Sequence, residues 1–93
     1  MKIYKYELPT SRGIFKRAMS EIQYTMHVEA LDFPTGSRAF MGAVVDETKE
    51  VTYTIHALHT GDDVPDSERF LRIGTAVFDG GSYVLHYYRE VRH

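Results

Sequence analysis

The chain has 93 residues, contains no cysteine and carries a formal net charge of −2. We expect a single domain over residues 1–93, without a disulfide, a thiol nucleophile or a cysteine-ligated metal site. The acidic balance disfavours general nucleic-acid binding, which normally needs a strongly basic surface. A hydrophobic fraction of 43% is typical of a folded protein, and the unusual feature is seven Tyr and five Phe without Trp.

Six stretches with two-residue periodicity and many β-branched or aromatic residues predict β-strands. In chain order they cover residues 1–8, 22–31, 38–45, 51–57, 70–78 and 82–90. In the second stretch the alternation predicts one face made of Ile22, Tyr24, Met26, Val28 and Ala30. The third stretch is more continuously apolar, so we expect it to be central in the sheet.

Turn residues lie between these stretches, at positions 34–37, 46–49 and 79–81. The two glycines of the last turn predict a tight hairpin between the final two strands. The loop over 60–68 has room for one short helical turn near 65–69, with Asp63 as a cap. The pattern therefore predicts an all-β domain of six or seven antiparallel strands, a small meander that forms a barrel or a sandwich.

Residues 12–31 also fit a different structure. Ile14, Ala18, Ile22, Met26 and Ala30 recur every four residues, as on one face of an amphipathic helix. The clean alternation after Ile22 favours a strand over 22–31, and 12–20 stays open between helix and strand.

Five short motifs resemble an uncharacterised family of small phage and prophage proteins. They are Ile3-Tyr4-Lys5-Tyr6, Ala43-Val44-Val45-Asp46, Thr60-Gly61 with Pro65-Asp66, Ile73-Gly74-Thr75, and His86-Tyr87-Tyr88. Their order and spacing match over most of the chain, whereas 12–31 departs from the pattern. The resemblance implies an all-β phage-type protein and no particular reaction. Because small accessory phage proteins often bind and block host proteins, it also makes a host protein the expected partner, for example one of a defence system.

Tyrosines are the main candidates for a protein interface: Tyr4 and Tyr6 near one end, Tyr83, Tyr87 and Tyr88 near the other. Tyrosine is enriched at binding hot spots because it is large, rigid and amphipathic. The alternative is that these rings pack inward with their hydroxyls at the rim of the core. Alternation places Tyr87 and Tyr88 on opposite faces, so one is exposed or covered by a second subunit. Tyr4 and Tyr6 would lie beside the last strand if the termini pair.

Acidic residues in the loop extend the predicted protein interface to Asp62, Asp63 and Asp66. Their spacing does not match an EF-hand, because Gly61 precedes the first acid and Pro65 interrupts the run. A solvated turn is the simpler interpretation, and mimicry of nucleic-acid phosphates is a further hypothesis.

A metal ion could be held by His56 and His59, together with His86 on the last strand. Residues three apart on a strand point to opposite faces, so His56 and His59 could share an ion only if their strand ends before His59. We therefore expect no metal and no cofactor. The sequence has no Gly-x-Ser-x-Gly elbow and no phosphate-binding loop, and no pair of carboxylates can be placed in a cleft. We therefore expect a protein that is not an enzyme.

Charge is unevenly distributed, with five basic residues against Glu7 in 1–17 and seven acids against Lys49 in 46–68. The basic stretch contains Tyr4, Tyr6 and Phe15, so stacking of single-stranded nucleic acid is one alternative function. A β-barrel that sequesters a small ligand or nucleotide is another. No apolar run reaches the length of a signal peptide or a membrane span, so we expect a cytoplasmic homo-oligomer, in the host cytoplasm if the chain is phage-encoded.

Overall fold

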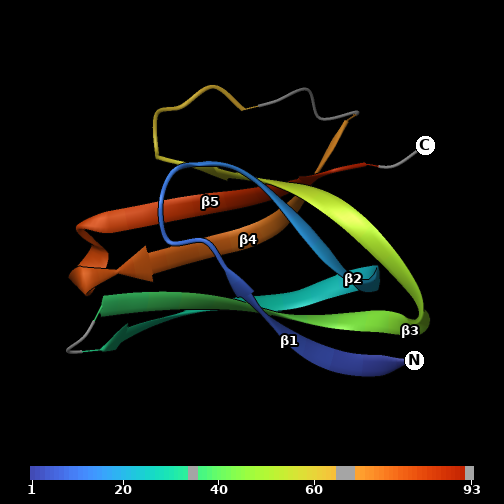
Figure 1. The fold of residues 1–93 in the computed structure, drawn as a ribbon. Helices are drawn as coiled ribbons and strands as arrows, with labels where there is room; N and C mark the ends of the chain where they lie inside the picture. The colour runs from blue at the N-terminus through green and yellow to red at the C-terminus, as the bar shows by residue number, and fades with distance from the viewer. Residues whose placement is uncertain (34–35, 65–68, 92–93) are drawn as a thin grey trace.

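The computed structural model describes residues 1–33, 36–64 and 69–91, and it confirms an all-β domain (Figure 1). Five antiparallel strands form one sheet, and a 3-10 turn, η1 (Asp79–Gly81), joins the last two. The strands are β1 (Lys2–Leu8), β2 (Gly13–Phe33), β3 (Gly36–Leu58), β4 (Phe70–Phe78) and β5 (Tyr83–Glu90). The helix considered over 12–31 is therefore wrong, since β2 is a strand of 21 residues. The helical turn expected near 65–69 falls mostly outside the described residues, as does the Pro34-Thr35 part of the first turn.

Two long strands replace the three shorter ones expected in the middle of the chain. The prediction that 46–49 separates two strands is wrong, because β3 runs through it for 23 residues. Ser20 pairs with Glu50 and Glu21 pairs with Asp46, so residues 47–49 form a bulge opposite β2. The Asp46 carboxylate accepts hydrogen bonds from the Thr48 amide and hydroxyl at 3.0 and 2.6 Å. These hydrogen bonds are typical of a turn. Here they form within a bulge that bends β2 and β3 together, and the chain does not reverse its direction.

The strand order is β1-β3-β5-β4, with β2 paired along the other side of β3. β1 pairs with residues 39–45 of β3 and β5 with residues 55–58, so β3 is central, as predicted. The connections are thus not a simple meander, and the ends of the sheet do not join into a closed barrel. The two terminal strands do not pair, because β3 lies between β1 and β5, so the condition under which Tyr4 and Tyr6 would lie beside the last strand is not met.

The bend in β2 and β3 folds the sheet over itself, so that the β4–β5 hairpin lies above the first half of β3 (Figure 1). The free edges of β2 and β4 approach each other at Val28 and Gly74. Between the two layers lies a core of buried side chains, the largest being Tyr87, Phe78, Met41, Ile55, Leu85 and Val45. Because these side chains fill the centre, the fold does not enclose a ligand as a barrel would. No helix in the described part of the chain is long and apolar enough to cross a bilayer.

Bulges in β2 change which of its side chains reach the core. The register shifts between Ile22 and Tyr24 and again between Thr25 and His27. Each shift inserts an extra residue and reverses the alternation. Ile22 stays buried, but Tyr24 is 59% exposed and Met26 is 50% exposed, so the prediction that all three share one buried face is wrong.

Candidate functional site

Two tyrosine hydroxyls hold the bent part of β2. The Tyr6 hydroxyl accepts a hydrogen bond from the Ser20 amide at 3.2 Å, and the Tyr53 hydroxyl accepts one from the Ile22 amide at 2.8 Å. Both amides lie where the register of β2 shifts. Unpaired backbone donors at a bulge are costly when buried. These hydroxyls therefore stabilise the bend that gives the molecule its two layers.

Two further tyrosines hold the connection between β1 and β2. Tyr83 donates its hydroxyl proton to the carbonyl of Thr10 at 3.2 Å, and Tyr87 donates to the carbonyl of Pro9 at 2.5 Å. Burial raises the pKa of the Tyr87 phenol well above its ordinary value, which keeps it a proton donor. Tyr6, Tyr83 and Tyr87, predicted as interface residues, thus have defined roles within the fold.

Tyr4 and Tyr88 are the predicted interface tyrosines with no such backbone contact in the described structure. Tyr4 is half-buried and packs edge-on against Tyr6, with ring centroids 6.1 Å apart. Tyr88 is half-buried on the face opposite the fully buried Tyr87, as alternation predicted. It lines a hollow of about 210 Å³ that also contains His86 and Asp62.

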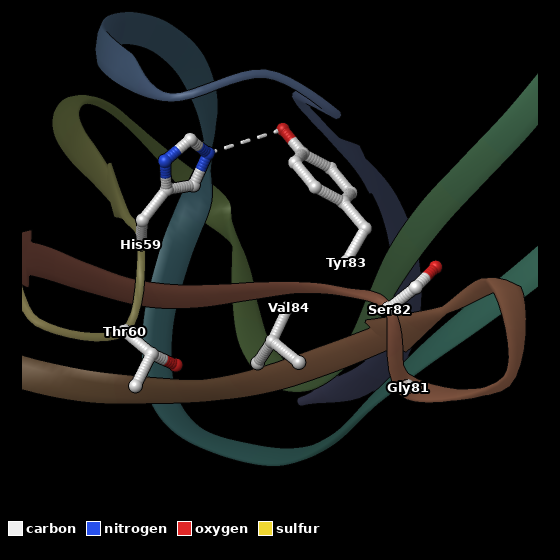
Figure 2. A pocket seen from close by; sticks show the side chains of 6 residues that line it. All are labelled: His59, Thr60, Gly81, Ser82, Tyr83 and Val84. Carbon is white, nitrogen blue, oxygen red and sulfur yellow. Dashed lines mark hydrogen bonds between the residues drawn. The ribbon is translucent and has the colours of Figure 1, made fainter.

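A second hollow, of about 320 Å³, lies between the loop after β3 and the start of β5 (Figure 2). His59 and Tyr83 face each other across it, with the imidazole Nε2 3.4 Å from the phenol oxygen. Because Tyr83 gives its proton to Thr10, its oxygen accepts from His59, which assigns the proton of a neutral His59 to Nε2. Both contacts of the Tyr83 hydroxyl therefore join two loops of the protein. His59 and Tyr83 are bonded to each other and do not form a free acid–base pair in this hollow.

His86 belongs to a chain of hydrogen bonds on the outside of β4 and β5. Arg72 donates to the Thr75 hydroxyl at 2.9 Å, and that hydroxyl lies 3.1 Å from His86 Nδ1. His86 Nε2 lies 2.9 Å from the Thr60 hydroxyl. Both ring nitrogens thus have hydroxyl partners, and the chain ties the loop after β3 to the sheet.

The predicted acidic interface is divided by the structure. Asp62 accepts the His59 amide at 2.8 Å and pairs with Arg12 Nε at 3.0 Å, so it bridges two loops. Asp63 is exposed in the same loop, and Asp66 lies outside the described residues. The acidic loop therefore contains one structural carboxylate and one accessible to solvent.

The histidines considered as metal ligands have separate partners. His56 Nε2 lies 3.1 Å from the Glu90 carboxylate, whereas His59 and His86 contact hydroxyl groups. Within residues 1–33, 36–64 and 69–91, no three His or acidic side chains come together in a group that could hold a metal ion.

An apolar row crosses three strands on the side of β1, β3 and β2 that points away from the core, which we call the outer face. Ile3 of β1 lies opposite Val44 of β3, and Val44 lies opposite Tyr24 of β2. Ile3 is 65% exposed, and Tyr24 projects from this row as well. Val44, between them, is half-buried. An apolar row with exposed side chains at both ends is a candidate interaction surface.

Charged pairs flank the apolar row on the outer face. Lys5 pairs with Glu29 at 2.7 Å, and Arg38 donates two hydrogen bonds of 2.9 Å to Glu7. Both cations also lie over the ring of Phe40, at 4.6 and 5.0 Å from its centroid. The hydrogen bond from Arg38 lowers the pKa of Glu7, and the one from Lys5 lowers the pKa of Glu29.

These pairs predict a small loss of stability in acid. A carboxyl whose pKa is lower in the folded than in the unfolded protein stabilises the fold above its ordinary pKa, here 4.5. That contribution disappears as the pH falls below this value through the folded-state pKa. We expect Glu7→Gln and Glu29→Gln to flatten the dependence of Tm on pH below about pH 4.5. Glu50→Gln, at an exposed position with no ion pair to a described residue, is the control, and an equal flattening by it would contradict the assignment.

The geometry defines a small all-β protein whose candidate binding features lie on the outside of an open, folded sheet. The chain belongs to the family described as "Domain of unknown function (DUF7352)", which matches residues 1–93. This confirms the expectation of an uncharacterised family. Comparison with curated proteins and with solved structures produced no match.

Sequence reasoning missed the residues that build the exposed surfaces. Ile3, Val44 and Tyr24 come together only through the pairing of three strands, and Tyr24 was expected in the core. Residues 12–31 contain Met, Ala and Glu, which are less typical of a regular strand. This composition was the one local indication that the strand is irregular there.

Proposed function

We propose that this protein binds a host protein through the outer face and inhibits or modulates it without catalysing a reaction. The observation that carries the proposal is the apolar row across β1, β3 and β2, in which Ile3 and Tyr24 are exposed and Val44 is half-buried. Protein interfaces combine an apolar centre with a polar rim. On this face the rim is supplied by Lys5–Glu29 and Arg38–Glu7.

The resemblance to small phage proteins supports a host protein as the partner, with the host cytoplasm as the place of action. The acidic net charge and the pairing of basic residues count against nucleic acid as the main partner. In the basic stretch, Lys5 pairs with Glu29 and Arg12 pairs with Asp62, so two of its cations are already neutralised. A phosphate backbone would have to compete with these carboxylates.

The test is to capture partners from a bacterial host lysate with the wild-type protein and matched variants. Ile3→Glu places a charge at one end of the row and Val44→Arg places one at its centre. Each is expected to reduce recovery of a stoichiometric partner at least about tenfold. Ile14→Glu is the control, because Ile14 is 67% exposed on the first half of β2, away from the outer face. Unchanged circular dichroism spectra show that the variants fold.

Equal recovery of the partner by Ile3→Glu and wild type would contradict the proposal. A second outcome would also contradict it: no lysate protein is captured, and size-exclusion chromatography shows a dimer that Val44→Arg dissociates. In that case the outer face would join copies of this chain into the homo-oligomer that the sequence analysis expects.

A further inference from the structure

The strand β1 has one free edge. It pairs with residues 39–45 of β3 on one side, and it is the first strand in the order β1-β3-β5-β4 (Figure 1). On its other side, no backbone group in the described part of the chain is hydrogen-bonded to β1. Alternate residues of an edge strand point their N–H and C=O groups away from the sheet, where these groups can pair with another strand.

The side chains of β1 alternate between the two sides of the sheet. Lys5 and Glu7 lie on the outer face, two residues apart. Tyr4 and Tyr6 lie on the other side, where both are half-buried and pack edge-on against each other. The free edge therefore presents one cation and one anion on one side and two aromatic rings on the other.

Both charges of β1 already have partners of opposite sign within the sheet. Lys5 reaches across β3 to Glu29 at 2.7 Å, and Glu7 accepts two hydrogen bonds of 2.9 Å from Arg38. These contacts fix the two side chains of β1 on the outer face beside the free edge. A cation and an anion at neighbouring positions of one face can pair with a second copy of the same strand that runs in the opposite direction.

Only one register of two antiparallel copies of β1 places Lys5 opposite a carboxylate. Residues directly opposite each other lie on the same face, so a two-fold axis brings one residue opposite its own copy. With the axis at Tyr6, Lys5 of each copy faces Glu7 of the other. An axis at Lys5 or at Glu7 places two like charges opposite each other, which is destabilising. An axis at Tyr4 places Lys5 opposite Ile3.

From this pattern we infer that two copies of the chain join through β1 with the two-fold axis at Tyr6. The signs of the charges then alternate across the contact, from Glu29 and Lys5 of one copy to Glu7 and Arg38 of the second copy. On the core side the two Tyr6 rings face each other. Cross-strand pairs of opposite charges and of aromatic rings both stabilise antiparallel sheets.

This contact goes beyond the host-protein role of the outer face and does not rest on it. The two-fold axis is perpendicular to the sheet, so the outer faces of the two copies lie on the same side of one continuous sheet. Val44 lies on β3, away from the free edge of β1, and the contact does not cover it. A dimer formed through β1 is therefore distinguishable from one formed through the outer face.

The experiment is analytical ultracentrifugation from about 1 μM to about 1 mM, because a single strand pair makes a small interface and a weak dimer. Lys5→Glu and Glu7→Lys each place like charges opposite each other in both halves of the contact. Each is expected to weaken dimerisation at least about tenfold. An equimolar mixture of the two variants is expected to recover most of that loss as a heterodimer, because both halves of the contact then combine opposite charges again.

Lys16→Glu and Glu50→Lys reverse exposed charges outside β1 and are the control. Neither variant is expected to change dimerisation, and circular dichroism shows that all variants fold. Val44→Arg is also expected to leave the dimer intact. The inference is overturned if the wild type stays monomeric up to about 1 mM, if the mixture of the two β1 variants does not recover the dimer, or if Val44→Arg dissociates it.

Discussion

Replacing Tyr87 by Ala is expected to lower the free energy of unfolding by about 3–5 kcal/mol. The side chain is fully buried between the layers, and its hydroxyl donates to the Pro9 carbonyl. The substitution removes an aromatic ring from the core and releases the connection between β1 and β2. Because small domains have total stabilities of roughly 5–15 kcal/mol, a loss of this size removes a large share of the stability of a domain at the lower end of that range.

Two matched variants separate the contributions of the ring and the hydroxyl. Tyr87→Phe keeps the ring and leaves the buried Pro9 carbonyl without its donor, at an expected cost of about 1–3 kcal/mol. Tyr88→Ala, one residue along on the opposite face, is expected to cost about 1 kcal/mol. Urea denaturation followed by far-UV circular dichroism measures all three. A Tyr88→Ala cost as large as that of Tyr87→Ala would contradict this account of the core.

Replacing Gly74 by Val is expected to force β2 and β4 apart at the contact between Gly74 and Val28. A Cβ atom at Gly74 would lie 2.6 Å from Val28 Cγ2 and 3.1 Å from Val28 Cβ. Val28 is β-branched and half-buried against the core, so rotation about its χ1 is restricted and its side chain cannot move freely into solvent. We expect a loss of about 3 kcal/mol, the upper end of the cost of overpacking, as a lower midpoint of urea denaturation.

Gly42 supplies the comparison for this second prediction. A Cβ atom there would lie 2.5 Å from His27 Cε1, which is as close as the contact at Gly74. His27 is exposed on the outer face, so its ring can swing into solvent. Gly42→Ala should therefore cost less than Gly74→Ala, and Val28→Ala should relieve the cost of Gly74→Ala in a double-mutant cycle. Equal costs at the two glycines, or no relief by Val28→Ala, would show that β2 and β4 are not tightly packed at Val28 and Gly74.

Most strands could be predicted because their pattern is local. Period-two alternation and β-branched residues identified β1, β4 and β5 nearly to their ends, and Gly80 and Gly81 identified the last hairpin turn. The same alternation placed Tyr87 and Tyr88 on opposite faces, as the structure confirms. These features depend on neighbours a few residues apart, which a single sequence displays directly.

Bulges and distant hydrogen bonds could not be predicted in this way. The register shifts after Ile22 and Thr25 each reverse which side chains of β2 face the core. The alternation within β2 does not show where an extra residue will lie opposite the neighbouring strand. The tyrosine hydroxyls find their partners far along the chain, with Tyr53 binding the amide of Ile22 and Tyr87 the carbonyl of Pro9. Their abundance was visible in the composition, but their role depends on which backbone groups the bend leaves unpaired.

The sequence by itself therefore determined the all-β class, most strand positions and the surplus of tyrosine. The tertiary structure alone decided that β2 and β3 bend as long continuous strands. It also decided that Ile3, Val44 and Tyr24 form one apolar row across three strands. The physical reason is that periodicity reports which face a residue prefers, whereas strand pairing over long separations decides which faces and edges meet.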